Sequence, residues 1–192
     1  PPFPPIAVSH SAPADHDLHS FPNDALPISE QAIEAIDHAH LARENWQSRA
    51  ADERAGILER AADLLESRAS IFHYLAIREA GKSWGDAVDE VREAVDFCRY
   101  YAVRARDEGF SERHALGVVV CISPWNFPLA IFLGQITAAL AAGNTVVAKP
   151  AEQTPLIAAE AVRLLHEAGV DPNALQFIPG DGAVIGEALV SH

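Results

Sequence analysis

Apolar and polar residues follow two different periods along the chain. Between residues 28 and 112, apolar side chains recur every three or four positions, as they do in amphipathic helices. Gly81 and Gly109 each follow such a stretch and suit the left-handed residue that ends a helix. The clearest stretch carries one apolar stripe, made of Val88, Val91, Val95, Cys98 and Ala102. We therefore predict a helical segment over residues 28–112.

From Gly117 onward the pattern changes. Short runs of β-branched and other apolar residues predict strands that lie in a sheet covered by helices. We expect the first of these strands to be buried on both faces. The predicted strands cover residues 118–122, 145–148 and 175–178.

Predicted helices separate these strands. One covers residues 129–142 and ends at Gly143, the next has Thr154 as its N-cap, and the last begins after Gly182. The order β-α-β-α-β-α with short connections predicts a parallel sheet with helices on its faces. The fold class is therefore α/β: an N-terminal helical segment is followed, over residues 113–192, by a partial Rossmann-like domain. We expect this sheet to be truncated, because three strands are too few for a complete doubly wound domain.

Composition narrows the cellular setting and the partners. Residues 1–27 are rich in Pro, Ser, His and Asp and predict an irregular arm, whose histidines lack the spacing of a metal site. The net charge of −13 argues against nucleic acid or an anionic membrane as a partner. No stretch is long and apolar enough to span a membrane. Two cysteines without framework spacing fit a reducing compartment, so we expect a cytoplasmic protein.

The loop after the first predicted strand offers one candidate catalytic group. Its sequence is Ser123-Pro124-Trp125-Asn126-Phe127-Pro128, and two prolines restrict the backbone around the three central residues. A fixed Asn126 amide can donate a hydrogen bond to an oxygen that becomes negatively charged during a reaction. The alternative is an ordinary strand-to-helix turn, in which asparagine is common.

The ends of the second and third strands offer candidate nucleotide-binding residues. Lys149 and Glu152 stand where they can reach a ribose, and the carboxylate would repel a 2′-phosphate and so favour NAD over NADP. Alternatively, these two residues form a solvated ion pair. Gly182 and Gly186 lie at a strand-to-helix junction whose backbone N–H groups can face a pyrophosphate. Glycine-rich turns are common, so this last signal is weak by itself.

Taken in order, two segments resemble hallmark motifs of the aldehyde dehydrogenase superfamily. They are Pro124-Trp125-Asn126-Phe127-Pro128 and Lys149-Pro150-Ala151-Glu152. A narrower resemblance, over residues 46–192, is to the L-glutamate γ-semialdehyde (Δ1-pyrroline-5-carboxylate) dehydrogenase domain of the bifunctional proline utilization A family. It rests on Arg78-Glu79-Ala80-Gly81-Lys82, on residues 91–101 and on residues 151–157.

This resemblance implies an enzyme that oxidises L-glutamate γ-semialdehyde to glutamate with NAD as cofactor. A cysteine thiolate would be the nucleophile and a glutamate the general base. The resemblance assigns Asn126 to the oxyanion hole and Phe127 to the wall of the substrate tunnel. It assigns cofactor contacts on the nicotinamide side to Ser123, Pro124 and Trp125, at the adenosine ribose to Lys149, Pro150, Ala151 and Glu152, and beside the adenine and pyrophosphate to Gly182 and Gly186.

The resemblance also places the nucleophile and the general base beyond His192. We interpret Cys98 and Cys121 as core thiols, whose pKa burial raises. We therefore expect the chain to be a fragment that is inactive alone, from a homo-oligomeric parent. A flavin-binding proline dehydrogenase domain, with FAD, would lie upstream. Two alternatives stay open: a dehydrogenase for another semialdehyde, and a non-catalytic nucleotide-binding or assembly module.

Overall fold

The computed structural model describes residues 28–107 and 114–191. In this part of the chain no helix is both long and apolar enough to cross a bilayer. The predicted arm at residues 1–27 and the predicted helix end at Gly109 lie outside the described residues. The elements are α1 (Ile28–Ser48), α2 (Ala51–Ser67), α3 (Ala69–Ala80), α4 (Trp84–Ala105), β1 (Val118–Ile122), α6 (Ala130–Ala141), β2 (Thr145–Lys149), α7 (Pro155–Ala168), β3 (Leu175–Phe177) and α8 (Gly182–Ser191). This order confirms the predicted α/β class.

The strands form one parallel sheet in the order β1-β2-β3. Every residue of the central strand β2 is buried. In β1, by contrast, Val118, Val119 and Val120 are half-buried and Ile122 is 46% exposed. The expectation that this strand is buried on both faces is therefore wrong in part. Helices cover both of its faces, but within the described residues β1 is an edge strand and lacks a neighbour on one side.

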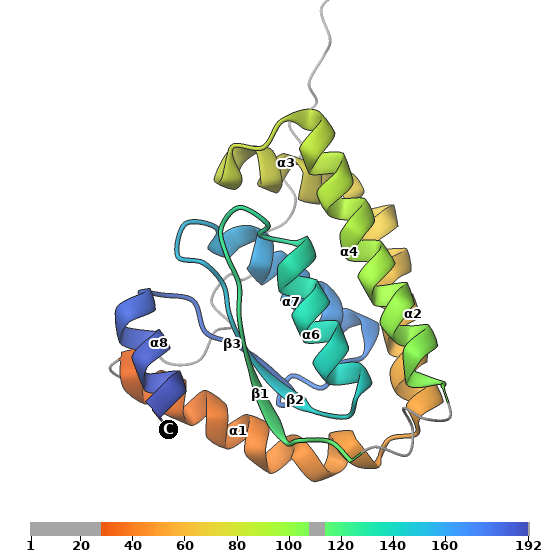
Figure 1. The fold of residues 1–192 in the computed structure, drawn as a ribbon, viewed down its shortest axis with the longest axis vertical. Coiled ribbons are helices and arrows are strands. Elements are labelled where there is room, and N and C mark those ends of the chain that lie inside the picture. Colours follow the sequence, from red (N-terminus) through yellow and green to blue (C-terminus); the bar gives the residue numbers. More distant parts are fainter. Residues whose placement is uncertain (1–27, 108–113, 192) are drawn as a thin grey trace, which may run out of the picture.

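Helices cover both faces of this sheet (Figure 1). On one face α6 and α7 pack against the strands, and α2 and α4 lie behind them. On the other face α1 and α8 pack together, and Ala35, Ala39, Ile185 and Leu189 bury Val147. The first helix of the predicted helical segment thus contacts the sheet directly. The division of the chain at residues 112 and 113 stays a prediction.

The helix boundaries follow the local sequence signals. Gly81 ends α3 with a φ of 64°, and Gly143 follows α6 with a φ of 85°, a conformation that costs glycine little. In α4, four members of the predicted apolar stripe are buried and Val88 is half-buried. The alternation of apolar and polar residues therefore predicts both the elements and the faces that they bury.

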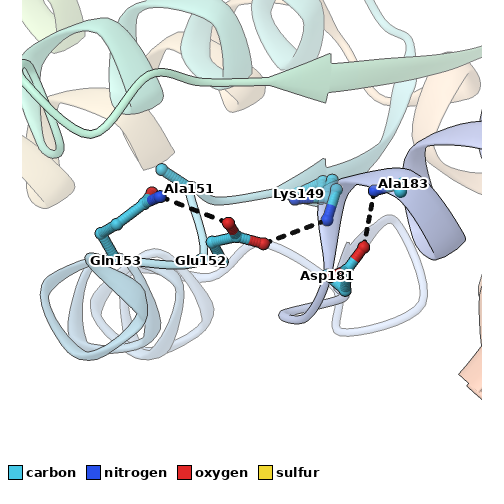
Figure 2. Close-up of a pocket in the computed structure, with 7 residues that line it drawn as sticks. Lys149, Ala151, Glu152, Gln153, Asp181 and Ala183 are labelled. Carbon is cyan, nitrogen blue, oxygen red and sulfur yellow. Dashed lines mark hydrogen bonds between the residues drawn. The ribbon is translucent and has the colours of Figure 1, made fainter.

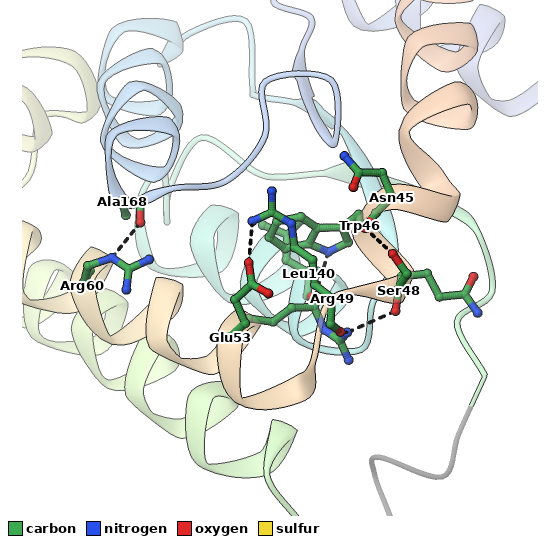
Figure 3. Close-up of polar contacts among 10 residues, drawn as sticks. Asn45, Trp46, Ser48, Arg49, Glu53, Arg60, Leu140 and Ala168 are labelled. Atoms are coloured by element: carbon green, nitrogen blue, oxygen red, sulfur yellow. Dashed lines mark hydrogen bonds and ion pairs between the residues drawn. The ribbon is translucent and has the colours of Figure 1, made fainter.

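Side chains from α1 and α2 fix the C-terminal ends of the helices that cover the sheet (Figure 3). Trp46 in α1 is 1% exposed, and its Nε1 donates to the Leu140 carbonyl of α6 at 3.1 Å. Arg60 in α2 donates from Nε to the Ala168 carbonyl of α7 at 3.0 Å. A guanidinium beside the last carbonyls of a helix also complements the helix dipole. These contacts hold the sheet and its helices in a fixed position against the helical segment.

Candidate functional site

The three segments singled out in the sequence meet at the carboxyl edge of the sheet. Ile122, the last residue of β1, is paired with Lys149, the last residue of β2. The backbone N–H of Ser123 donates to the Lys149 carbonyl at 3.2 Å, and that of Ile178 donates to the Ala148 carbonyl at 3.0 Å. The parallel arrangement thus brings the loops after the strands together, as predicted for ligand sites in such sheets.

A pocket lies between the ends of β2 and β3 (Figure 2). Its volume is about 340 Å³, large enough for part of a nucleotide. It opens beside the N-terminus of α8, where backbone N–H groups point outward. The residues that line it are Lys149, Ala151, Glu152, Gln153, Asp181, Gly182 and Ala183.

Lys149 and Glu152 face this pocket from different positions. The Lys149 residue is 4% exposed, and its ammonium donates to the Pro150 carbonyl at 3.1 Å. Glu152 is exposed and accepts a hydrogen bond from the Gly182 backbone N–H at 3.2 Å (Figure 2). In the part of the chain that the structure describes, these two residues do not form the ion pair that the simpler interpretation expected.

The N-terminus of α8 is capped by carboxylates of the protein itself. Asp181 accepts from the backbone N–H groups of Ala183 at 2.7 Å and of Val184 at 3.2 Å, and Glu152 takes that of Gly182. An anionic ligand would need the same backbone N–H groups as hydrogen-bond donors. Gly186 lies one turn further along α8 and is not part of the pocket lining. The pocket therefore suits a neutral group with hydroxyls better than a second anion.

The loop between β1 and α6 presents four side chains to solvent. Ser123 and Pro128 at its ends are buried, whereas Pro124, Trp125, Asn126 and Phe127 between them are exposed. Among the described residues, the Asn126 amide has no hydrogen-bond partner, so both of its N–H groups remain free to donate. This is the arrangement that the predicted role of Asn126 requires.

Two charged residues behind this loop were given no role from the sequence. The Glu90 carboxylate accepts from the backbone N–H groups of Leu129 at 3.0 Å and Ala130 at 2.9 Å, and it pairs with Lys82 at 2.5 Å. The Lys82 ammonium lies 4.4 Å from the centroid of the Phe127 ring. One signal was available in the sequence: an acidic residue stands on the buried, apolar face of α4.

A third glutamate replaces a predicted cap. Thr154 precedes α7 as expected, but its side chain makes no capping hydrogen bond. Instead, the two carboxylate oxygens of Glu79 in α3 each accept one backbone N–H, from Leu156 and from Ile157, both at 2.8 Å. The predicted capping position is therefore correct and the predicted capping group is wrong, because a charged acceptor reaches the helix from a distant segment.

The two cysteines lie in the core, as predicted. Burial raises the pKa of the Cys98 thiol to about 12 and that of the Cys121 thiol to about 12. A thiol must be ionised to attack a carbonyl carbon, so neither group is suited to be a nucleophile near neutral pH.

Sequence comparison places this arrangement in a known family. The model of the "Aldehyde dehydrogenase family" matches residues 25–192. A "Bifunctional protein PutA" of Escherichia coli is 50% identical in an alignment of 193 positions, which covers 96% of this chain and 14% of that protein. A "1-pyrroline-5-carboxylate dehydrogenase" of Bacillus subtilis is 40% identical in an alignment of 176 positions, which covers 85% of this chain and 34% of that protein.

A solved structure agrees with the sequence matches. The crystal structure of a 1-pyrroline-5-carboxylate dehydrogenase from Thermus with bound NAD has a TM-score of 0.81 at 36% identity. It covers 85% of this chain, and the match is 34% of that chain. The chain thus spans between about one seventh and one third of the length of these relatives. The chain belongs to the aldehyde dehydrogenase family.

Proposed function

We propose that this chain supplies part of the NAD site and one oxyanion-hole donor of a dehydrogenase that oxidises L-glutamate γ-semialdehyde to glutamate in proline degradation. The observation that carries the proposal is the meeting of the Asn126 loop with Lys149 and Glu152 at one edge of the sheet. The names of relatives, among them "bifunctional proline utilization A (PutA) protein" and "1-pyrroline-5-carboxylate dehydrogenase", support the substrate.

The residues around the pocket fit the adenosine ribose of NAD. Among the described residues, the Lys149 ammonium has one hydrogen-bond acceptor, the Pro150 carbonyl, so two of its three N–H groups remain to donate to ribose hydroxyls. Glu152 would accept from the 2′-hydroxyl. When bound, NAD supplies the hydride acceptor. Glu152 and Asp181 already accept the first N–H groups of α8, so a pyrophosphate cannot bind them directly at Gly182. We therefore assign this pocket to the ribose of NAD.

The chain's own contribution to the reaction would be electrostatic. When a nucleophile adds to the aldehyde carbon, negative charge collects on the aldehyde oxygen, and the Asn126 amide can donate a hydrogen bond to that oxygen. The exposed Phe127 ring beside it would exclude water and contact the substrate's methylene groups. We propose that the nucleophilic cysteine lies outside residues 1–192, since both cysteines of this chain are buried and their raised pKa keeps them protonated.

The test is Asn126→Ala in the full-length protein. Loss of one oxyanion donor should lower kcat by about 10²- to 10³-fold. Asn173→Ala is the matched control, because Asn173 is exposed beside β3 at the opposite edge of the sheet and should keep the wild-type rate. An unchanged kcat in Asn126→Ala would remove the proposed role of this residue.

A further inference from the structure

Glu90 and Lys82 form a buried charged pair directly behind the loop that carries Asn126. The exposed fraction of the Glu90 side chain is 1% and that of Lys82 is 12%. One carboxylate oxygen of Glu90 accepts both backbone N–H groups at the start of α6, and the other pairs with the Lys82 ammonium at 2.5 Å. One oxygen of Glu90 is thus directed at the end of the loop and the other at the Lys82 ammonium.

Capping accounts for the Glu90 carboxylate but not for the Lys82 ammonium buried with it. Burying a carboxylate and an ammonium costs several kcal/mol, whereas an exposed serine or aspartate can cap a helix without that cost. The loop cannot supply such a cap, because the residues before α6 are Pro128 and Leu129 and neither has a polar side chain. The acceptor is instead delivered from α4, a helix nearly forty residues earlier in the chain.

The pair also reaches the other side of the loop. The Lys82 ammonium lies 4.4 Å from the centroid of the Phe127 ring, a favourable cation–π contact. The backbone of Lys82 is fixed as well, since its N–H donates to the Ala76 carbonyl at the end of α3. A rigid connection therefore runs from α3 and α4 through Lys82 to Phe127, the residue next to Asn126.

We propose that Glu90 and Lys82 are positioning residues of the aldehyde site. Glu90 fixes the point where the loop enters α6, Lys82 fixes the Phe127 ring, and together they set the direction of the Asn126 amide. Neither residue needs to touch the substrate. This inference rests on the proposed function of Asn126.

The experiment uses the full-length protein with three variants of the pair. Glu90→Gln keeps an oxygen that can accept the two N–H groups but removes the charge, Lys82→Met removes the cation, and Lys82→Arg retains it. We expect the first two to lower kcat by at least about 10-fold, because displacements near 1 Å of a reacting group have effects of this size. The KM for NAD should change by less than about 2-fold, since the ribose pocket is fixed by other residues. Lys82→Arg should recover most of the lost kcat.

Two further variants separate positioning from stability. Lys82→Met/Glu90→Gln removes both charges, which leaves no unpaired buried ion, so it should fold even where a single variant does not, and yet retain the low kcat. Arg54→Lys is the matched control, since Arg54 donates to the Ala141 carbonyl at the opposite end of α6. It should lower the melting temperature and leave kcat unchanged.

The outcomes are distinct. Wild-type kcat in the double variant, or an equal loss of kcat in Arg54→Lys, would overturn the positioning role. If Asn126→Ala lowers kcat while the pair variants do not, this inference alone fails. If Asn126→Ala has no effect, the proposed function itself is wrong.

Discussion

The carboxylate of Glu152 should set the choice between NAD and NADP, and Glu152→Gln tests this directly. The substitution removes one negative charge and keeps an oxygen that can accept the ribose hydroxyl and the Gly182 N–H. The cap on α8 and the shape of the pocket should therefore persist. What changes is the repulsion that a 2′-phosphate meets where NAD carries a hydroxyl.

The size of this repulsion follows from the exposure of Glu152. In water, two unit charges about 5 Å apart repel by about 0.8 kcal/mol, and a phosphate with nearly two charges by about 1.5 kcal/mol. Salt at about 0.1 M has a Debye length of about 10 Å and removes roughly 40% of this energy. The ratio of kcat/KM for NADP to that for NAD should then rise about 5-fold at this salt concentration and about 10-fold at about 0.01 M.

The assay is the initial rate with each cofactor in the full-length protein at both salt concentrations. Glu187→Gln is the matched control, because Glu187 is an exposed glutamate of α8 that does not line the pocket. A cofactor ratio in Glu152→Gln that equals the ratio in Glu187→Gln would contradict the placement of the ribose. A rise that does not depend on salt would contradict the electrostatic cause.

Two further predictions concern the core. Trp46→Phe should lower stability by about 2 kcal/mol, from one lost hydrogen bond and a small cavity, and lower the melting temperature by about 4–8 °C; the cost stays at this level because the Leu140 carbonyl still accepts the Gly143 N–H. Trp84→Phe, at a residue that is 65% exposed, should shift the melting temperature by less than about 2 °C. Equal shifts of the two variants in calorimetry would refute the structural role of Trp46. Cys98 and Cys121 should react with a disulfide reagent at pH 8 only after denaturation. Burial raises the pKa of each thiol to about 12 and leaves few thiolates in the native state. Fast reaction of these two thiols in the folded protein would refute this.

Local sequence signals predicted the elements of this fold well. The start of α7 at Pro155 and the end of α3 at Gly81 depend on backbone preferences of single residues, so they can be read without knowledge of the rest of the chain. The burial of β1 could not be predicted in the same way. Whether Ile122 is covered depends on which elements flank the strand, and periodicity within the strand contains no such information.

In the candidate site, too, some features could be predicted from the sequence and others depend on distant elements. Asn126, Lys149 and Glu152 could be found because strand ends in a parallel sheet meet at one edge, so their positions in the chain already imply proximity. The hydrogen-bond partner of Glu152 could not be predicted in this way. Glu152 contacts the Gly182 N–H and not Lys149, and this depends on how α8 leaves β3.

The least predictable residues are the glutamates that cap helices from a distance. Glu79 reaches α7 across 77 positions of the chain and Glu90 reaches α6 across 39, and both come from the helical segment before the sheet. Each takes the first N–H groups of a helix that directly follows a loop of the candidate site. A carboxylate at this place is stabilised by the helix dipole, and its loss leaves N–H groups without partners that are buried at α6 and more exposed at α7. The helical segment therefore does more than cover the sheet. It fixes the N-termini of α6 and α7, where the loop with Asn126 and the loop with Lys149 and Glu152 end.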